Sequence, residues 1–443
     1  MITVAEHLES ILRKIRPADE VELDLQRAYG LVLTRDIVSE VDLPRFDNSA
    51  MDGYAVLAAD VAGASSTHPL LMRVVGDIKA GDTEQRLHVP GHAWRIMTGA
   101  PVPEGADTIV KVEDTDAHPR EPKIRAAPQP RRHIRPAGDD LRVGDVVVAA
   151  GTTLGPAQVA ALASAGIGQV RVIGPVRVVV LSTGDELVAL GAPLASGQIV
   201  DSNGPMLAAA VRAAGFHTVH VGRLPDDKDR IRSEIDRHLR HADAIITTGG
   251  VSKGAYDEVK AVLSKQGAMS FPEVAMQPGK PQGFGVLGRR KVPVFTLPGN
   301  PVSALVSFEV FVRPALARRA GGRYTATTYP ALVVQGWSSP EGKQQYARVT
   351  VESDTTGAYA VRPAGAGGSH LVGGMAGADA LAIVPAATTE VEVGAQVEVQ
   401  PLRPWGEIEA RLQAHERGRA EAEEMPTGAR AQAGRRGRHR AAR

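Results

Sequence analysis

The sequence predicts a multidomain α/β protein with a helical, elongated linking domain, a β-rich domain inserted into it, a three-layer α/β domain and a small C-terminal β-barrel. The chain has 443 residues, more than one hydrophobic core normally holds, so two to four domains are expected. From Val176 to Arg319, apolar strand-like runs alternate with helical runs, which is typical of a mostly parallel sheet. Residues 325–403 alternate in strand fashion without a helical pattern, as in a barrel or sandwich.

The beginning of the chain predicts the linking domain, made of residues 1–44 and 141–172. Its first helix shows apolar residues at helical spacing, with Val4, Leu8, Ile11, Leu12 and Ile15 on one face and Pro17 at the end. A second helical run covers residues 157–166. Residues 45–140 contain short β-like runs broken by glycine and proline, which indicates the inserted β-rich domain.

Residues 173–324 predict the three-layer α/β domain. The expected strands are Val176–Leu181, Thr218–Gly222 and Ala244–Thr248, followed by a hairpin of Gln282–Leu287 and Val292–Leu297. The expected helices are Pro205–Ala214, Asp229–His241, Asp257–Gln266 and Pro301–Arg319. Ligands of such sheets bind beyond the carboxyl ends of the strands, so the loops after Leu181, Gly222, Thr248 and Leu297 are the candidate binding loops.

The end of the chain, residues 404–443, is polar and basic. A segment of this composition buries too little apolar surface to fold, so we expect a disordered, dispensable tail after about Arg411. A weak contact with a polyanion is the alternative role for its final arginines.

The stretch from Gly249 to Asp257 carries the strongest chemical signal. Its paired glycines allow a close backbone approach, and the helix that follows offers free N–H groups to an anion. A carboxylate at the same point, Asp257, is explained if a divalent cation lies between it and a phosphate. An ordinary turn with Asp257 as the helix N-cap is the alternative.

Further acidic residues follow the other strands of the predicted sheet: Asp185, Glu186, Asp226 and Asp227. The carboxyl ends of parallel strands share one edge, so these side chains should converge with Asp257 near one cleft. Magnesium takes one or two carboxylates together with phosphate oxygens and water. Singly, each of these residues is equally well explained as a cap or turn residue.

Several other residues could bind an anion or reach the same cleft. The stiffened turns Pro278–Pro281 and Pro298–Pro301 would fix Lys280 as a positive charge, unless it is merely a solvated hairpin residue. In the last domain, Arg348 and Ser369 could offer a guanidinium and a hydroxyl to an oxyanion, or be ordinary surface residues. The polar loop around Asp52 is distant in sequence and would have to come from elsewhere, such as a second subunit.

The composition argues against several classes of protein. The chain has no cysteine, so thiolate metal sites, disulfides and a cysteine nucleophile are excluded. A net charge of +1 and few aromatic residues argue against nucleic-acid binding. Neither a membrane-spanning run nor a signal peptide is visible, so a cytoplasmic protein is expected. No Walker loop, dinucleotide fingerprint or paired-histidine zinc motif is present.

Taken together, these stretches resemble the molybdopterin molybdenumtransferase family, to which the C-terminal domain of gephyrin is related. The matching motifs run in family order over about residues 1–403: Phe46–Ala55 (FDNSAMDGYA), Arg95–Ala106 (RIMTGAPVPEGA), Arg135–Asp140, Ser182–Leu187 (STGDEL), Asp201–Asn203, Thr248–Lys260, Pro278–Pro281, Leu297–Ala304 (LPGNPVSA) and Gly368–His370. The resemblance implies a homodimer with its active site between subunits. It also implies a magnesium-dependent reaction of adenylylated molybdopterin with molybdate that gives molybdenum cofactor and AMP.

The resemblance also assigns roles residue by residue. Asp226 and Asp257 match magnesium ligands, and the matching positions tied to activity are Asp52, Thr98, Asp140, Glu186 and Asp257. Arg348 and Ser369 match the molybdate-binding positions, and Lys280 would contact the pterin phosphate or the dithiolene end. The glycine loop and the second turn add the expected substrate-binding residues Gly249, Gly250, Ser252, Pro298, Asn300 and Pro301. Glu273 and Gln277 depart from the lysines of some relatives, and Lys253 is the candidate to compensate for them.

Three other hypotheses follow from the same residues. The adenylyltransferase of the same pathway shares the α/β domain, but its relatives usually lack the other three domains; it is also a possible partner of this chain. A scaffold or binding paralogue would keep the fold without the reaction, which the acids Asp52, Asp226 and Asp257 argue against. A tungstate-specialised paralogue would look the same in sequence, since the two oxyanions are nearly equal in size and charge.

Overall fold

The computed structural model describes residues 1–250, 258–265, 268–354, 357–365, 368 and 371–424. The chain divides into two compact units. One unit joins Met1–Asp19 to the chain from Gly174 onward, and it contains the α/β domain and the C-terminal barrel. The other unit is Glu20–Ile173.

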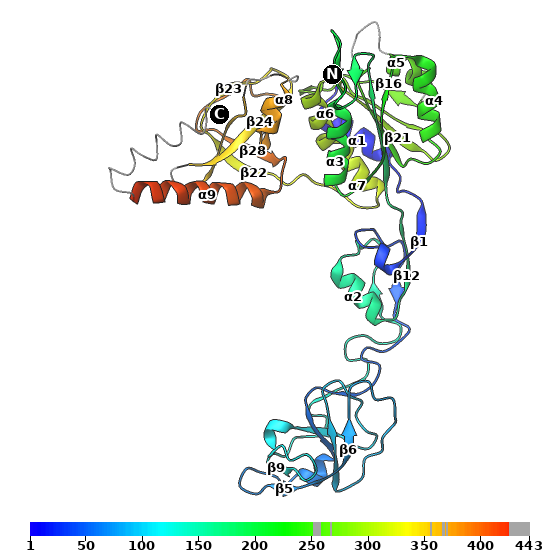
Figure 1. Ribbon diagram of the computed structural model, residues 1–443, viewed down its shortest axis with the longest axis vertical. Helices are drawn as coiled ribbons and strands as arrows, with labels where there is room; N and C mark the ends of the chain where they lie inside the picture. Colours follow the sequence, from blue (N-terminus) through cyan, green and yellow to red (C-terminus); the bar gives the residue numbers. More distant parts are fainter. Residues whose placement is uncertain (251–257, 266–267, 355–356, 366–367, 369–370, 425–443) are drawn as a thin grey trace. The chain divides into compact units, whose positions relative to one another are not determined.

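The α/β domain is built on a six-stranded sheet (Figure 1). Its strand order is β16 (His217–Leu224), β13 (Arg177–Thr183), β17 (Ala244–Thr248), β21 (Val292–Leu297), β20 (Gly283–Leu287) and β18 (Met269–Ser270). The first four strands are parallel, and β20 and β18 are antiparallel to their neighbours. All residues of β17 and β21 are buried, as expected for strands covered on both faces. The predicted strands and hairpin are confirmed.

Helices cover both faces of this sheet (Figure 1). One face packs against α1 (Val4–Lys14), α3 (Asn203–Ala213), α6 (Pro301–Ser307) and α7 (Arg313–Arg319). The other face packs against α4 (Lys228–His238) and α5 (Glu258–Ser264). The predicted helix Pro301–Arg319 is interrupted by a π-helical turn, Phe308–Val312. Pro314 lies just beyond this turn and cannot donate a backbone hydrogen bond, which accounts for the irregularity.

The placement of the first helix differs from the prediction. Residues 1–44 were expected in the linking domain, but α1 packs into the α/β core through Val4, Ile11 and Ile15. Its connection is also held by the backbone, since the Ala18 N–H donates to the Arg319 carbonyl at 2.7 Å. The spacing of apolar residues predicts which face of a helix is buried, but it does not predict which domain covers that face. The prediction that α1 belongs to the linking domain was therefore wrong.

The C-terminal domain is a closed five-stranded barrel, which confirms the predicted barrel. Its strands pair in the order β24 (Gln344–Ser353), β25 (Tyr359–Pro363), β22 (Tyr329–Val333), β28 (Gln396–Pro401) and β26 (Ala380–Val384), and β26 closes on β24. A short strand of the α/β domain, β19 (Met276–Gln277), pairs with β24. The small pair β23 (Trp337–Ser338) and β27 (Glu390–Val391) and the helix α8 (Val372–Ala376) complete the domain.

A long helix follows the barrel where a disordered tail was expected. The helix α9 covers Trp405–Glu424 (Figure 1). Its side chains Ile408 and Leu412 are buried in the barrel core. The prediction of disorder is therefore wrong for residues 405–424, and residues 425–443 lie outside the described part. The prediction failed because average composition does not take account of a few apolar side chains spaced along one face of a helix.

The second unit contains paired ribbons and a small β-rich core. Its ribbons are β1 (Glu20–Asp24) with β12 (Gln169–Ile173) and β2 (Ile37–Val38) with β11 (Val146–Val148), next to the helix α2 (Pro156–Ser164). The β-rich part has a four-stranded sheet of β6 (Arg73–Ile78), β7 (His92–Ile96), β4 (Gly53–Val56) and β8 (Thr108–Lys111). Two further pairs are β3 (Asn48–Ser49) with β10 (Ile134–Arg135) and β5 (Leu70–Leu71) with β9 (Lys123–Ile124). The expected linking part is thus as much strand as helix.

Within the described ranges, none of the helices combines the length and the apolar character needed to cross a membrane.

Candidate functional site

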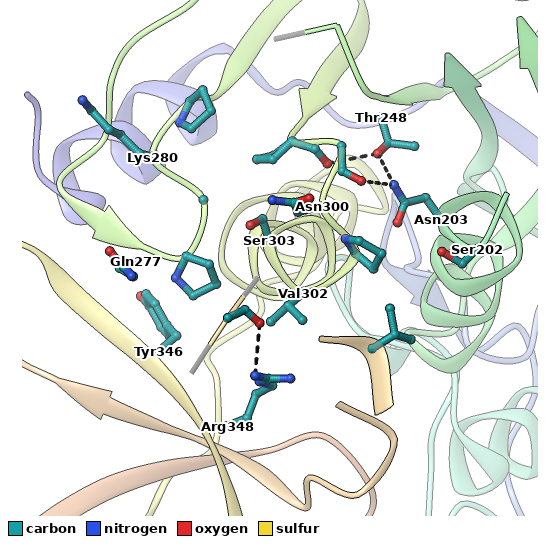
Figure 2. A pocket seen from close by; sticks show the side chains of 18 of the residues that line it. Ser202, Asn203, Thr248, Gln277, Lys280, Asn300, Val302, Ser303, Tyr346 and Arg348 are labelled. Atoms are coloured by element: carbon teal, nitrogen blue, oxygen red, sulfur yellow. Dashed lines mark hydrogen bonds between the residues drawn. The ribbon is translucent and has the colours of Figure 1, made fainter. Parts of the chain in front are cut away.

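A large cavity lies in the unit that contains the α/β domain and the barrel. Its volume is about 1360 Å³, and residues of both domains line it (Figure 2). The predicted site residues that it brings together are Glu186, Asp226, Gly249, Gly250, Lys280, Pro298, Asn300, Pro301 and Arg348. Ser252, Asp257 and Ser369 were also predicted, and they lie outside the described residues, as does Lys253.

The glycine loop begins directly after β17. Gly249 has a φ of +94°, and a Cβ at this position would lie 2.6 Å from the Thr183 carbonyl oxygen. No other residue fits both the backbone angle and the neighbour. Gly250 also has a positive φ, +66°. The loop therefore brings bare backbone to the cavity, as the sequence predicted.

A polar network behind this loop was not predicted as part of the site. Asn203, at the start of α3, donates from Nδ2 to the Thr248 hydroxyl at 2.9 Å and to the Gly299 carbonyl at 2.6 Å (Figure 2). Thr248 in turn donates to the Pro298 carbonyl at 3.0 Å. The buried Oδ1 of Asn203 has no hydrogen-bond partner among the described residues, so it can accept one from a bound molecule. The amide thus joins the end of β17, directly before the glycine loop, to the turn Pro298–Pro301.

The acidic residues divide into cavity-lining and structural groups. Asp226 and Glu186 line the cavity, whereas Asp227 caps α4 by accepting the Arg230 N–H at 2.8 Å. Asp185 accepts the backbone N–H of Asp226 at 3.1 Å. The prediction that Asp227 shares the cleft is replaced by its alternative, a cap residue.

The Asp226 carboxyl is electrostatically strained. Burial is the main cause that raises the pKa of Asp226, and the neighbouring carboxylates of Asp185, Glu186 and Glu258 raise it further. A cation close to this carboxylate would relieve both effects.

Lys280 lies on the α/β side of the cavity, at its edge (Figure 2). Its Nζ lies 3.0 Å from a carboxylate oxygen of Glu273, and both side chains are partly exposed, at 41% and 37%. An exposed pair of this kind is weak, so Lys280 can exchange Glu273 for another anion at little cost.

Arg348 lies on the barrel side and is much more constrained. It belongs to β24 and is only 8% exposed. Its guanidinium donates to the Leu371 carbonyl at 2.5 Å and to the Gly368 carbonyl at 3.2 Å, the latter drawn in Figure 2. Burial lowers the pKa of Arg348, yet an arginine keeps its charge in proteins. The cavity therefore contains a fixed and poorly solvated positive charge.

Several barrel residues that line the cavity were missed from the sequence: Trp337, Ser339, Lys343, Gln345 and Tyr346. Tyr346 is almost fully buried, and burial raises the pKa of its hydroxyl. The hydroxyl of Ser339 is buried and has no hydrogen-bond partner in the described part of the chain. None of these residues belongs to a motif, and their barrel pattern reveals only that they are in strands or turns.

Three predicted residues belong to the other unit. The Asp52 carboxylate accepts the Thr98 N–H at 2.7 Å and the Thr98 hydroxyl at 2.9 Å, and these bonds lower the pKa of Asp52. The structure thus joins two residues that are distant in sequence. Asp140 is exposed in a turn, where its N–H donates to the Leu43 carbonyl at 2.9 Å.

A divalent cation would have few protein ligands here. Among the described residues, no group of three histidine or acidic side chains could hold a metal ion. Magnesium is compatible with such a sparse site, because it keeps waters and binds one or two carboxylates plus substrate phosphates. Asp226 and Glu186 are carboxylates that line the cavity, and Asp257, which was predicted as a magnesium ligand, lies outside the described residues.

Models of three protein regions match successive parts of the chain. They are the MoeA N-terminal region, domains I and II, at residues 2–166; a probable molybdopterin binding domain at 179–318; and the MoeA C-terminal region, domain IV, at 330–402. Among the described helices and strands, β12 and α9 lie wholly outside these three matches.

Whole-chain relatives agree with these matches. Molybdopterin molybdenumtransferase 2 of Mycobacterium tuberculosis is 41% identical over 409 residues, which cover 91% of this chain and 100% of the relative. The molybdopterin molybdenumtransferase of Haemophilus influenzae is 34% identical over 405 residues, or 90% of this chain and 98% of the relative.

Solved structures show the same similarity. A molybdopterin biosynthesis MoeA protein from Pyrococcus horikoshii has a TM-score of 0.77 and 30% identity, and it covers 91% of this chain and 100% of its own. A second structure of such a protein, from strain OT3, has a TM-score of 0.71 and 27% identity over 90% of this chain. Similarity of sequence along nearly the whole length, together with the shared fold, shows that the chain belongs to the molybdopterin molybdenumtransferase family.

Proposed function

We propose that this chain is a molybdopterin molybdenumtransferase, which takes adenylylated molybdopterin and molybdate and releases molybdenum cofactor and AMP. The observation that carries the proposal is the composition of one cavity. Its α/β side holds acids and bare backbone at the ends of strands, and its barrel side holds the buried charge of Arg348. These features suit the two ends of the reaction, a phosphoanhydride and an oxyanion.

The barrel side is suited to the oxyanion. Arg348 is desolvated and held by two carbonyl groups, so little order is lost when a ligand binds. Two unit charges 4 Å apart attract by about 4 kcal/mol at an effective dielectric constant of 20, against about 1 kcal/mol in bulk water. A buried arginine can therefore attract a dianion such as molybdate more strongly than an exposed one. Ser369 is assigned to the same subsite.

The α/β side is suited to the phosphoanhydride. Gly249 and Gly250 expose backbone, and Pro298, Asn300 and Pro301 form the opposite turn. Lys280 is placed to exchange its contact with Glu273 for a phosphate of the substrate. We assign Ser252 to this end as well. The cavity would thus hold the substrate with its phosphoanhydride toward the α/β strands and its dithiolene toward the barrel.

We assign magnesium to Asp226 and Asp257. The ion, when bound, would neutralise charge on the phosphoanhydride as AMP leaves. The chain's own contribution is to keep Asp226 partly buried beside other carboxylates, so that a nearby cation would stabilise its ionised form. Glu186 lines the same side and is assigned to catalysis.

We further propose a cytoplasmic homodimer in which the second subunit contributes Asp52, Thr98 and Asp140 to catalysis. Support comes from the Asp52 carboxylate, which is exposed and held in its ionised form by Thr98. A mixture of the impaired Asp52→Asn and Asp226→Asn proteins tests this arrangement. If sites are built across subunits, the mixed dimers are more active than either variant alone; if each chain is self-sufficient, mixing the two variants gives no gain.

AMP release from adenylylated molybdopterin, measured with magnesium in the presence and absence of molybdate, tests the function. The proposal requires molybdate-dependent release and a product that reconstitutes a molybdoenzyme apoprotein. Binding without release would instead indicate a scaffold paralogue. ATP consumption with unmodified molybdopterin would indicate an adenylyltransferase, and release driven only by tungstate would indicate a tungsten-specialised enzyme.

A further inference from the structure

The helix α9 is an integral part of the barrel domain, although it follows the residues that the C-terminal family model matches, 330–402. Trp405 stacks on Tyr329 with ring centroids 3.9 Å apart, and it meets the edge of Tyr359 at 4.8 Å. Together with the burial of Ile408 and Leu412, these contacts fix the first turns of α9 on the barrel. Because the helix is packed rigidly, its side chains can fix the positions of the barrel strands that they contact.

One residue of α9 completes the pairing of β24. Backbone pairing of β24 with β26 ends at Val349 and Ala380. Beyond that point, the Asp379 carboxylate accepts the Val351 N–H at 2.9 Å, and Arg411 donates to the Val351 carbonyl at 3.0 Å. Arg411 also donates to the Asp379 carboxylate at 2.6 Å. The two side chains therefore replace one missing step of the β-ladder with an ion pair.

The carboxylate of this ion pair is buried, whereas the Arg411 side chain is 49% exposed. Asp379 is only 3% exposed, and its second oxygen lies 3.6 Å from the Nε of Arg403. A buried carboxylate that loses a cationic partner is strongly disfavoured, so Asp379 depends on these arginines. The contact of Arg411 with Asp379 thus holds both the strand and the residue that precedes β26.

The same contacts hold the strand and the segment that position the guanidinium of Arg348. The chain between β25 and β26 supplies the carbonyls of Gly368 and Leu371 that hold Arg348. This segment is attached to β24 at both ends: the Ala364 N–H donates to the Arg348 carbonyl, and the Asp379 N–H donates to the Val349 carbonyl, each at 2.9 Å. Any loosening at Asp379 therefore reaches the strand of Arg348 and the carbonyls that orient it.

We propose that Arg411 is a positioning residue for the oxyanion subsite: through Asp379 and Val351 it sets the place of Arg348 in the cavity. The inference rests on the proposed function, because it assigns the oxyanion to Arg348. It makes α9, in particular its first two turns, a determinant of molybdate affinity. Arg411 lies at the point after which the tail was expected to be dispensable, and the inference makes molybdate affinity depend on Arg411 itself.

The test compares Arg411→Ala and Arg411→Lys with a matched control, Arg417→Ala, which removes an exposed arginine from the same helix. We expect Arg411→Ala to raise the KM and the calorimetric Kd for molybdate about 10-fold, within the range for energetic coupling between sites. Its KM for adenylylated molybdopterin should stay within about twofold, and the Val351 amide should exchange faster with solvent. Arg411→Lys should recover part of the loss, and Arg417→Ala should match the unmodified protein.

Two results would overturn the inference. One is an unchanged molybdate affinity in Arg411→Ala. The other is an equal rise in the KM of both substrates together with a lowered Tm, because that combination indicates a merely structural role for Arg411. If Arg411→Ala does not fold, the same comparison of the KM for molybdate with the KM for adenylylated molybdopterin is made in Arg411→Lys. If the unmodified protein releases no AMP but binds molybdate more tightly than Arg411→Ala, the proposed function fails and the inference stands. If it binds no molybdate, both fail.

Discussion

The two sides of the cavity present their charges in different ways. On the α/β side, Lys280 is about 40% exposed and shares its charge with Glu273, and the acids lie on loops after strands. On the barrel side, Arg348 is 8% exposed and lies within a strand, fixed by backbone carbonyls. A charged side chain on an exposed loop can change its conformation as the substrate reacts, whereas a buried charge within a strand binds its ligand in one position. The comparison predicts adjustable recognition at one end and rigid recognition at the other.

The largest effect should come from the rigid side. Arg348→Ala removes hydrogen bonds to a charged ligand, each worth about 1.5–3 kcal/mol. We expect the KM for molybdate to rise at least about 100-fold, since two such bonds would be lost. Arg362→Ala serves as the control, because Arg362 is an exposed arginine on the adjacent strand that pairs with Glu352. An equal response of the two variants would remove the contrast between the two sides.

The next effect concerns the acids of the α/β side. Asp226→Asn should reduce AMP release about 10- to 100-fold, the usual range when a residue that supports a metal is changed. The molybdate dependence should be unaffected, because the change is at the other end. Asp227→Asn is the matched control, since asparagine caps a helix as well as aspartate does. Steady-state rates over a magnesium titration distinguish the two variants.

The same residue predicts a pH dependence of stability. Because the pKa of Asp226 is raised by burial in the folded protein, the folded state binds this proton more tightly than the unfolded state. The contribution of Asp226 to the free energy of unfolding therefore falls as the pH rises from 3.8, the ordinary pKa of aspartate, to the pKa of the folded state. Above that pKa the contribution no longer changes with pH.

Without magnesium, Asp226→Asn should therefore unfold at a higher denaturant concentration than the unmodified protein at neutral pH, and this difference should shrink as the pH falls. Denaturant unfolding at several pH values checks it. A variant that is less stable than the unmodified protein at neutral pH would show that Asp226 is held by structural contacts instead.

The smallest effect should come from the adjustable pair. Glu273→Gln releases Lys280 from an exposed ion pair worth under about 1 kcal/mol, so the KM for adenylylated molybdopterin should fall only about two- to fivefold. The gain should vanish at high salt, because exposed charges are screened. Glu398→Gln, on an exposed position of the barrel strand β28, controls for the change in net charge. A rise in KM would show that Glu273 itself contributes to binding.

The α/β side could be predicted from the sequence because its rules are local and general. Parallel strands place their carboxyl ends on one edge, so Asp226, Glu186 and Gly249 had to converge once the strands were recognised. The same reasoning could not separate Asp227, which faces its own helix as a cap. Arg348 alternates in a barrel strand like any other residue, and only the resemblance to a known family selected it.

The remaining differences depend on tertiary contacts. Asn203 connects Thr248, at the end of β17, to Gly299 of the second turn, and no spacing in the sequence indicates that these groups meet. The helix α9 is held by stacked aromatic rings and by an ion pair with the buried Asp379, which average composition does not reveal. The first helix, α1, was recognised as a helix, but the core that it joins is set by its contacts with α7 and β20.

The most direct test of two separate ends in one cavity is a paired titration of AMP release with molybdate and with magnesium in Arg348→Ala and Asp226→Asn. The account predicts that Arg348→Ala raises the molybdate concentration for half-maximal release and leaves the magnesium requirement unchanged. Asp226→Asn should do the reverse. If both variants shift the requirement for the same ion, or if neither shifts any, the assignment of the two sides is contradicted.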